Sequence, residues 1–367
     1  MVERTPVAVT GVHAVSALGR GAEAQLAGAL AGVPAFAPVR RFDVTGRRVG
    51  VAATAGDVGP LAEELADAVD VACRAAGLDR AGRRESALLL ATHGGPVTDG
   101  GPEVPALGGW LADRCGLGGR TRVYTSACVS ASTAVADAAT MIGRGDVTRV
   151  VVAAGYLVEP DQYALFDAGR ALATDGAARP FSAGRTGLLL GDGVAAVVLE
   201  AADGRGGEPV ATVRGWGRAG DAYHPCQPDP AGRGLARAVT AALRRAGLEP
   251  ADVGYVNANA TGTGLSDAAE AAALRAALGE HAGRVPVSST KAVHGHALEA
   301  SGLLELVVTV QALRHGKLPV NAGWLGPDPA CPLDVIVDAP RPAGSPYALS
   351  LNAAFGGANT ALLVGAA

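Results

Sequence analysis

The chain has 367 residues and a formal net charge of −4, and 49% of its residues are hydrophobic while only 4% are aromatic. This length allows a large core shared by two domains or lobes, and the charge lacks the basic excess of proteins that bind nucleic acid or anionic membranes. No run approaches the ~18 apolar residues of a membrane-spanning helix, and the first residues lack the apolar core of a signal peptide. The composition therefore predicts a cytoplasmic α/β protein that binds neither nucleic acid nor membrane.

Five cysteines stand at positions 73, 115, 128, 226 and 331. Their number is odd and their spacing shows no metal-binding pattern, so they predict free thiols in a reducing compartment. Cys128 differs from the others in standing at a predicted turn from a strand into a helix.

The first half of the chain alternates strand-like and helix-like segments. A continuous apolar run, ALLLA at 87–91, is typical of a strand that is covered on both faces. The elements expected in this half, in chain order, are a strand from residue 6 that ends near Gly11, helices over 21–30 and 57–76, the strand over 87–91, a loop over 93–119 with a short helix at 108–114, a strand at 123–124, a helix after Cys128, a strand over 149–155, and two strands within 188–200 joined by a turn at 191–193.

The second half repeats this rhythm. The expected elements are strands over 210–217, 253–258, 285–289, 335–337, 348–352 and 361–364, with helices over 232–246, 266–278 and 302–314. Such a repeated alternation predicts two similar α/β halves packed together. The glycine-rich stretch 204–207 is the natural seam, and it divides the chain into an N-terminal half over 1–204 and a C-terminal half over 207–367.

The segment around Cys128 predicts a reactive thiol. A β-prone pair runs into small residues, and apolar residues then continue at helical spacing until Gly143. Cys128 thus stands at a helix start, where unpaired N–H groups favour an anion and lower the thiol pKa below the ~8.5 of a free cysteine. The alternative is that Cys128 is a small apolar residue packed under the helix.

Four separated segments resemble one family in their order and spacing. They are residues 125–130 (TSACVS), residues 179–185 (RPFSAGR) with 191–193 (GDG), residues 289–291 (STK) with 295–296 (GH), and residues 355–359 (FGGAN). Together they are similar to the β-ketoacyl synthases of fatty-acid and polyketide assembly. The resemblance covers essentially the whole chain and implies the thiolase fold, a duplicated five-layer α-β-α-β-α architecture.

The resemblance also implies roles for individual residues. Cys128 matches the nucleophile that takes an acyl chain as a thioester, His296 matches the second catalytic histidine, and Lys291 matches the lysine that orders the site. Backbone N–H groups hold the oxyanion in this family, and Phe355 and Gly356 match its gate segment. The acyl chain arrives on the phosphopantetheine of an acyl carrier protein, and no metal or redox cofactor is implied.

The catalytic set departs from the family at its first histidine. Where the family has His-Gly-Thr-Gly-Thr, this chain has NATGT at 259–263. Asn259 can donate a hydrogen bond, but it cannot shuttle a proton or carry charge near neutral pH. His294 stands where the family usually has threonine, and it either supplies the missing donor or is turned away from the site. Decarboxylative condensation is therefore in doubt, while acyl transfer to Cys128 is less affected.

Other departures concern the gate and the cap of the acyl tunnel. The glycine-rich segment before the gate reads Asn-Ala-Ala at 352–354, which restricts the backbone near Phe355. The family's insertion between the ALLLA strand and Cys128 is abbreviated. His93 is predicted to be a surface or structural residue. Asp192 and Glu299 are predicted to be structural hydrogen-bonding groups, although Glu299 is close enough in sequence to influence His296.

Two functions follow, and a third is weaker. The chain is either a chain-length-factor-like partner in a heterodimer with a complete ketosynthase, or a stand-alone, homodimeric acyltransferase or condensing enzyme that uses Cys128, Asn259 and His296. The degenerate first histidine, gate and cap favour the partner, whereas retention of Cys128 favours the enzyme. A thiolase that uses coenzyme A is weaker, because nothing resembles its second catalytic cysteine.

Overall fold

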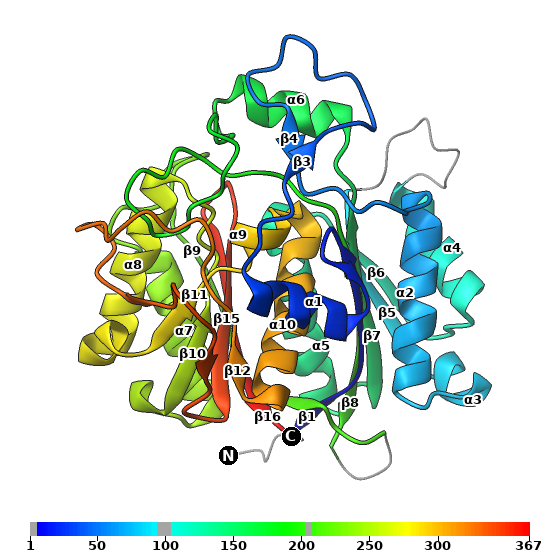
Figure 1. Ribbon diagram of the computed structural model, residues 1–367. Coiled ribbons are helices and arrows are strands. Elements are labelled where there is room, and N and C mark those ends of the chain that lie inside the picture. The colour runs from blue at the N-terminus through cyan, green and yellow to red at the C-terminus, as the bar shows by residue number, and fades with distance from the viewer. Residues whose placement is uncertain (1–5, 94–103, 203–206) are drawn as a thin grey trace.

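The computed structural model describes residues 6–93, 104–202 and 207–367. Two sheets stand side by side with helices between them and on both outer faces, which makes five layers (Figure 1). One strand pair, Val7–Val9 with Ala211–Val213, joins the two into a continuous twelve-stranded sheet. None of the helices in these residues combines the length and the apolar character that a membrane span needs.

The N-terminal half builds one sheet. Its helices and strands are β1 (Val7–Ser16), β2 (Gly19–Arg20), α1 (Ala22–Ala31), β3 (Ala37–Pro38), β4 (Val51–Ala52), α2 (Leu61–Ala75), α3 (Arg80–Arg84), β5 (Ala87–Ala91), α4 (Val104–Cys115), β6 (Thr121–Tyr124), the 3₁₀ turn η2 (Ala127–Val129), α5 (Ser130–Gly143), β7 (Arg149–Tyr156), α6 (Pro160–Ala168) and β8 (Gly193–Ala201).

The C-terminal half builds the other sheet. Its elements are β9 (Ala211–Gly220), α7 (Arg233–Ala246), η3 (Pro250–Asp252), β10 (Val253–Asn257), α8 (Gly264–Leu278), η4 (Gly279–Gly283), β11 (Pro286–Ser288), α9 (Lys291–His294), η5 (Leu298–Ala300), α10 (Ser301–His315), β12 (Lys317–Leu318), β13 (Asp334–Val335), β14 (Arg341–Pro342), β15 (Tyr347–Ala353) and β16 (Ala358–Ala366).

The two sheets have the same topology. The N-terminal order is β6-β5-β7-β8-β1 and the C-terminal order is β11-β10-β15-β16-β9. When the five main strands of each half are counted along the chain, both halves have the same spatial order, which is third, second, fourth, fifth and first. The strand directions also agree, because the pairs among the second, third and fourth strands are parallel while the fifth strand is antiparallel to both neighbours. The repeated rhythm seen in the sequence therefore reflects a structural duplication. The predicted seam at 204–207 lies largely outside the described residues, so the exact division stays a prediction.

The central layer is the most deeply buried part of the chain. Helix α10 contacts both β8 and β15, and α5 contacts both β7 and β16. Residues Ser301–Leu313 of α10 are buried all round, as expected of a helix enclosed by two sheets. Each of these two helices follows a short 3₁₀ turn, η2 before α5 and η5 before α10, and these turns contact one another. The duplication thus brings the starts of two central helices together, and Cys128 lies in the first of the two turns.

The structure corrects several predicted elements. Strand β1 does not end near Gly11 but continues to Ser16 through a register shift at that glycine. No hairpin forms within 188–200, because only β8 is a strand there, while Leu188, Leu190 and Gly191 make isolated bridges to other segments. Asp192 explains this, since its carboxylate accepts N–H groups from Ala55 and Val158 instead of sitting in a free turn. Helix α6 was not predicted, and α4 is longer than expected.

Candidate active site

One cavity of about 350 Å³ contains the predicted catalytic residues. Cys128, Asn259 and His296 all line it, although they come from η2, the turn after β10 and the turn before η5. Phe355 also lines the cavity, and its side chain is 55% exposed. The structure therefore brings together three of the four predicted catalytic residues around a space that is open to solvent.

Cys128 is presented by a strained turn. The chain leaves β6 at Tyr124, and Ala127 then adopts a left-handed backbone with φ of 51°. That conformation is unfavourable for a residue with a Cβ and persists only where the surroundings impose it. The Ser130 hydroxyl closes the turn by donating to the carbonyl of Ala127 over 2.7 Å. Cys128 thus lies one turn before α5 and is 9% exposed, with its surface on the cavity.

The Cys128 thiol is neutral in the resting site. Its pKa is raised to about 12, mainly by burial and next by the Glu299 charge, while the Lys291 charge lowers it. The prediction of an acidic thiol at a helix start is therefore wrong for the unliganded protein, because desolvation of the thiolate outweighs the favourable helix end. A proton acceptor must accordingly be at hand when Cys128 reacts.

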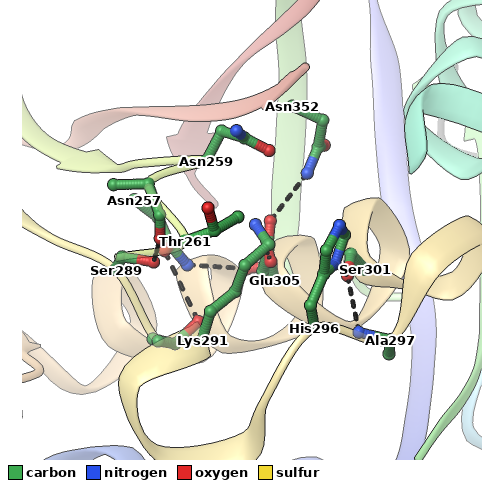
Figure 2. A network of polar contacts seen from close by, with 12 residues as sticks. Asn257, Asn259, Thr261, Ser289, Lys291, His296, Ala297, Ser301, Glu305 and Asn352 are labelled. Atoms are coloured by element: carbon green, nitrogen blue, oxygen red, sulfur yellow. Dashed lines mark hydrogen bonds and ion pairs between the residues drawn. The ribbon is translucent and has the colours of Figure 1, made fainter. Parts of the chain in front are cut away.

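His296 has the properties of that acceptor. Its Nδ1 lies 2.8 Å from the Ser301 hydroxyl oxygen, which also accepts the N–H of Ala297 over 3.0 Å (Figure 2). Burial, and after it the Lys291 charge, hold the pKa of His296 well below its usual value. The imidazole is therefore neutral near pH 7, and with Nδ1 held by Ser301 its Nε2 remains for the cavity that the ring lines. The sequence did not single out Ser301, because a serine five residues after a histidine does not indicate a hydrogen bond between them. Only the turn η5 brings the two side chains together.

Asn259 is held by its backbone. Its N–H donates to the Glu270 carboxylate over 2.8 Å, while its side-chain Oδ1 is buried and has no hydrogen-bond partner. The side chain lies at the cavity and is only 3% exposed. Burial raises the pKa of Glu270 to about 8, so this anchor is largely protonated at neutral pH. Asn259 therefore presents an amide to the cavity without a charged partner behind it.

Lys291 acts from behind the cavity rather than in it. It is 1% exposed and forms an ion pair of 2.5 Å with Glu305, which is 0% exposed (Figure 2). Glu305 also accepts the side-chain amide of Asn352 over 2.7 Å. Lys291 is not among the residues that line the cavity, but its charge lowers the pKa of both Cys128 and His296. Its predicted ordering role is therefore compatible with an indirect, electrostatic effect.

His294 does not supply the missing donor. The segment is the short helix α9, and both ring nitrogens are engaged, Nδ1 with the carbonyl of Gly295 at 2.7 Å and Nε2 with the Thr290 hydroxyl at 3.0 Å. Burial, followed by Lys291, lowers the pKa of His294 to about 3. His294 is fully buried and lies outside the cavity lining. The departure at Asn259 thus stands without a compensating histidine at this position.

Phe355 lies at the mouth of the cavity. Its ring stacks on Phe166 with centroids 6.1 Å apart, and Phe166 comes from the unpredicted helix α6. Gly356 has φ of 85°, which favours glycine, and its N–H donates to the carbonyl of Pro225 over 2.6 Å. Gly356 therefore shapes the loop that carries Phe355, and the gate role of this segment stays a prediction.

His93 and Glu299 are more than isolated structural residues. His93 Nδ1 lies 2.7 Å from a Glu299 oxygen, and Nε2 lies 2.8 Å from a Glu159 oxygen. Glu299 thus pairs with His93, and the expected influence on His296 is replaced by a direct effect on Cys128. Asp192 is structural as predicted, since it also pairs with Arg41 at 2.7 Å. The predicted cap falls partly on residues 94–103, outside the described residues.

Metal ligation finds no support in the part of the chain that the structure describes. No group of three or more His, Cys, Asp or Glu side chains there is arranged to hold a metal ion. The described cysteines are all free thiols. The chemistry that the arrangement can perform with its own residues is nucleophilic acyl transfer, with Cys128 as nucleophile and His296 as base.

The chain is similar to known proteins over about two thirds of its length or more. In the curated set, the chain is 35% identical over 258 residues to a 3-oxoacyl-[acyl-carrier-protein] synthase 2 of Staphylococcus aureus, covering 68% of this chain and 64% of that protein. It is 40% identical over 255 residues to nodulation protein E of Rhizobium meliloti, covering 67% and 62%. The aligned stretches thus span slightly less than two thirds of these relatives.

Among solved structures, the ishigamide ketosynthase/chain length factor superposes with a TM-score of 0.93 at 27% identity, covering 99% of this chain and 100% of that chain. This similarity confirms the predicted thiolase fold. Residues 75–204 match the model of the β-ketoacyl synthase N-terminal domain, and residues 210–324 match that of the C-terminal domain. Cys128 lies within the first matched region, and Asn259, Lys291 and His296 lie within the second. The chain therefore belongs to the β-ketoacyl synthase family.

Proposed function

We propose that this chain takes an acyl group onto Cys128 from an acyl carrier protein, and that it works as a chain-length-factor-like subunit beside a complete ketosynthase. The observation that carries the proposal is the single cavity lined by Cys128, Asn259 and His296, in which a nucleophile and a base are present but the first histidine is replaced. The setting would be type II polyketide or fatty-acid-like biosynthesis, with the acyl chain delivered on phosphopantetheine.

The acyl-transfer step uses groups that are already in place. Neutral His296 accepts the Cys128 proton at Nε2, and the thiolate attacks the carbonyl carbon of the carrier thioester. The tetrahedral intermediate then collapses, the bond to the carrier sulfur breaks, and the carrier thiol leaves with the proton that His296 held. The neutral state of His296, produced by burial and Lys291, supports this role.

Decarboxylative condensation is the step that the site supports poorly. Loss of CO₂ from a malonyl thioester leaves an enolate, which needs strong donors on its oxygen. Asn259 offers a neutral amide, and His294 is engaged elsewhere. Removal of one good donor from such a site costs ~10²-fold or more in rate. A complete ketosynthase subunit would then supply condensation.

The second candidate is a stand-alone condensing enzyme or acyltransferase with an atypical Cys-Asn-His set. The specific observation in its favour is that Asn259 and His296 line the same cavity as Cys128. The two candidates share acyl transfer and differ in condensation without a partner.

Intact-protein mass spectrometry tests the shared step. The protein is mixed with an acyl-loaded carrier protein, and Cys128→Ala serves as the control. The proposal expects an acyl adduct on the wild type that is missing from the variant. Absence of any adduct on the folded wild type would leave only a structural role for the chain.

A decarboxylation assay then separates the candidates. The wild type and Asn259→His are each given malonyl-loaded carrier protein, and CO₂ release is measured with no partner present. The partner role expects slow release by the wild type and about a 10²-fold increase in Asn259→His. Fast release by the wild type, with product formed alone, would favour the stand-alone enzyme.

A further inference from the structure

A carboxylate–imidazole–carboxylate cluster lies behind the nucleophile. His93 follows β5, Glu159 precedes α6, and Glu299 lies in η5, so three distant segments converge on one ring. Nδ1 and Nε2 are 2.7 Å and 2.8 Å from carboxylate oxygens of Glu299 and Glu159. The cluster is largely enclosed, since the side chain of His93 is 23% exposed and those of the two glutamates are 9% each.

The geometry determines the charge of this cluster. An ionised carboxylate only accepts hydrogen bonds, so a ring that bonds to two of them must carry a proton on both nitrogens. Burial lowers the pKa of His93, but the bonds to Glu159 and Glu299 outweigh that effect and raise it to about 9. Near neutral pH the cluster therefore holds two negative charges and one positive charge, which leaves a net charge of −1.

The cluster borders Cys128 through its Glu299 end. The turn η5, which carries Glu299, is in contact with η2, which carries Cys128. The other charges that act on the thiol come from α9 and α10, namely Lys291 and its partner Glu305. His296 is neutral and contributes no charge. Among these charges Glu299 has the largest effect on the thiol, and it acts against Lys291.

We propose that the Glu159–His93–Glu299 cluster is a positioning unit that sets the reactivity of Cys128 by placing a net negative charge beside the thiol. The cluster adds to burial in keeping Cys128 protonated in the resting protein, which protects the exposed edge of the sulfur from oxidation and unspecific alkylation. Reaction then depends on proton transfer to His296 when a thioester occupies the cavity. This inference deepens the proposed function, since it concerns the same nucleophile.

Alkylation by iodoacetamide tests the proposal without any carrier protein. The Cys128 thiolate displaces iodide and forms an S–C bond, so the rate at a given pH reports the thiolate fraction. Rates are read per cysteine by peptide mass spectrometry. Exposed Cys226 is the internal reference, and the buried cysteines at 73, 115 and 331 report unfolding, because they react only when the fold opens.

Removing a negative charge and removing the positive charge are expected to change the Cys128 alkylation rate in opposite directions. Glu299→Gln keeps a hydrogen-bond acceptor for His93 but removes a negative charge, so Cys128 alkylation at pH 8 rises about tenfold. Glu159→Gln removes the charge at the other end of the cluster, which is not among the main charges acting on the thiol, and gives a smaller rise. His93→Gln removes the positive charge, and the rate falls about threefold or more. If the cluster had only a structural role, all three variants would change the alkylation rate in the same direction.

The pH profile gives a second signature. As His93 loses its proton near pH 9, the charge of the cluster goes from −1 to −2, so the wild-type alkylation rate rises less steeply above that pH. His93→Gln lacks this flattening. Unchanged or slower alkylation in folded Glu299→Gln, or a flattening that survives in His93→Gln, would overturn the proposal. The alkylation assay does not require acyl transfer, so failure of this proposal and failure of the proposed function can be told apart.

Discussion

The Lys291–Glu305 ion pair is the feature whose removal has the largest expected cost. Lys291 is 1% exposed and Glu305 is 0% exposed, and their charged atoms are 2.5 Å apart. Lys291→Met keeps most of the apolar stem but leaves the Glu305 carboxylate without its cation, with the Asn352 amide still donating to it. Breaking a buried pair by removing one partner costs about 3–5 kcal/mol, which is a large share of the ~5–15 kcal/mol of a typical domain.

The cost depends on pH with a definite sign. Burial raises the pKa of Glu305 above 4.5, and Lys291 opposes this rise, so removing the lysine raises the pKa further. For an acid whose folded pKa lies above its unfolded pKa, ionisation destabilises the fold. Stability is therefore retained below about pH 4.5 and lost as the pH rises through the folded pKa. The deficit of Lys291→Met is expected to be larger at pH 8 than at pH 5.

Urea unfolding followed by far-ultraviolet circular dichroism at pH 5 and pH 8 measures this effect. Lys317→Met, at an exposed lysine, is the matched control and is expected to stay within about 0.5 kcal/mol of the wild type. Adding Glu305→Gln to Lys291→Met removes the stranded charge and should recover at least about 2 kcal/mol at pH 8. A deficit below about 1 kcal/mol, or one that is the same at both pH values, would refute the reasoning.

Three further predictions concern the base, the sheet and the cluster. Ser301→Ala frees His296 Nδ1 and should slow acyl transfer about tenfold, and since it also leaves the buried Ala297 N–H without its acceptor it should cost about 1–3 kcal/mol in urea unfolding; an unchanged rate would contradict the role of Ser301. Gly217→Ala places a Cβ 1.8 Å from an α7 carbonyl oxygen and should cost about 3 kcal/mol or more in urea unfolding, whereas Gly220→Ala meets no atom within 4 Å and should be tolerated sterically. The pKa of His93 is raised to about 9, so its stabilisation of roughly 2–3 kcal/mol is present below pH 6.5 and lost as pH rises through 9; His93→Gln should therefore approach the wild type in stability by pH 10.

Much of the candidate site was predictable because its residues lie in short local motifs. The strand-turn-helix pattern around Cys128 and the segments carrying Lys291 and His296 are continuous in the chain, and so is the substitution at Asn259. Their convergence on one cavity followed from the family resemblance rather than from periodicity. The acidity of Cys128 was predicted wrongly, since a helix start is a local feature whereas desolvation depends on everything packed around the sulfur.

The amino-acid sequence by itself determined the alternation of strands and helices and the duplication of the halves, because these follow from side-chain periodicity along the backbone. Only the tertiary structure decided which charges meet. His93 is 66 residues from Glu159 and 206 from Glu299, yet one ring bridges both carboxylates. The hairpin expected near Asp192 failed for the same reason, since that carboxylate binds backbone groups from distant segments. Hydrogen bonds, Coulomb forces and desolvation depend on distance and enclosure in space, and separation along the chain does not reveal either one.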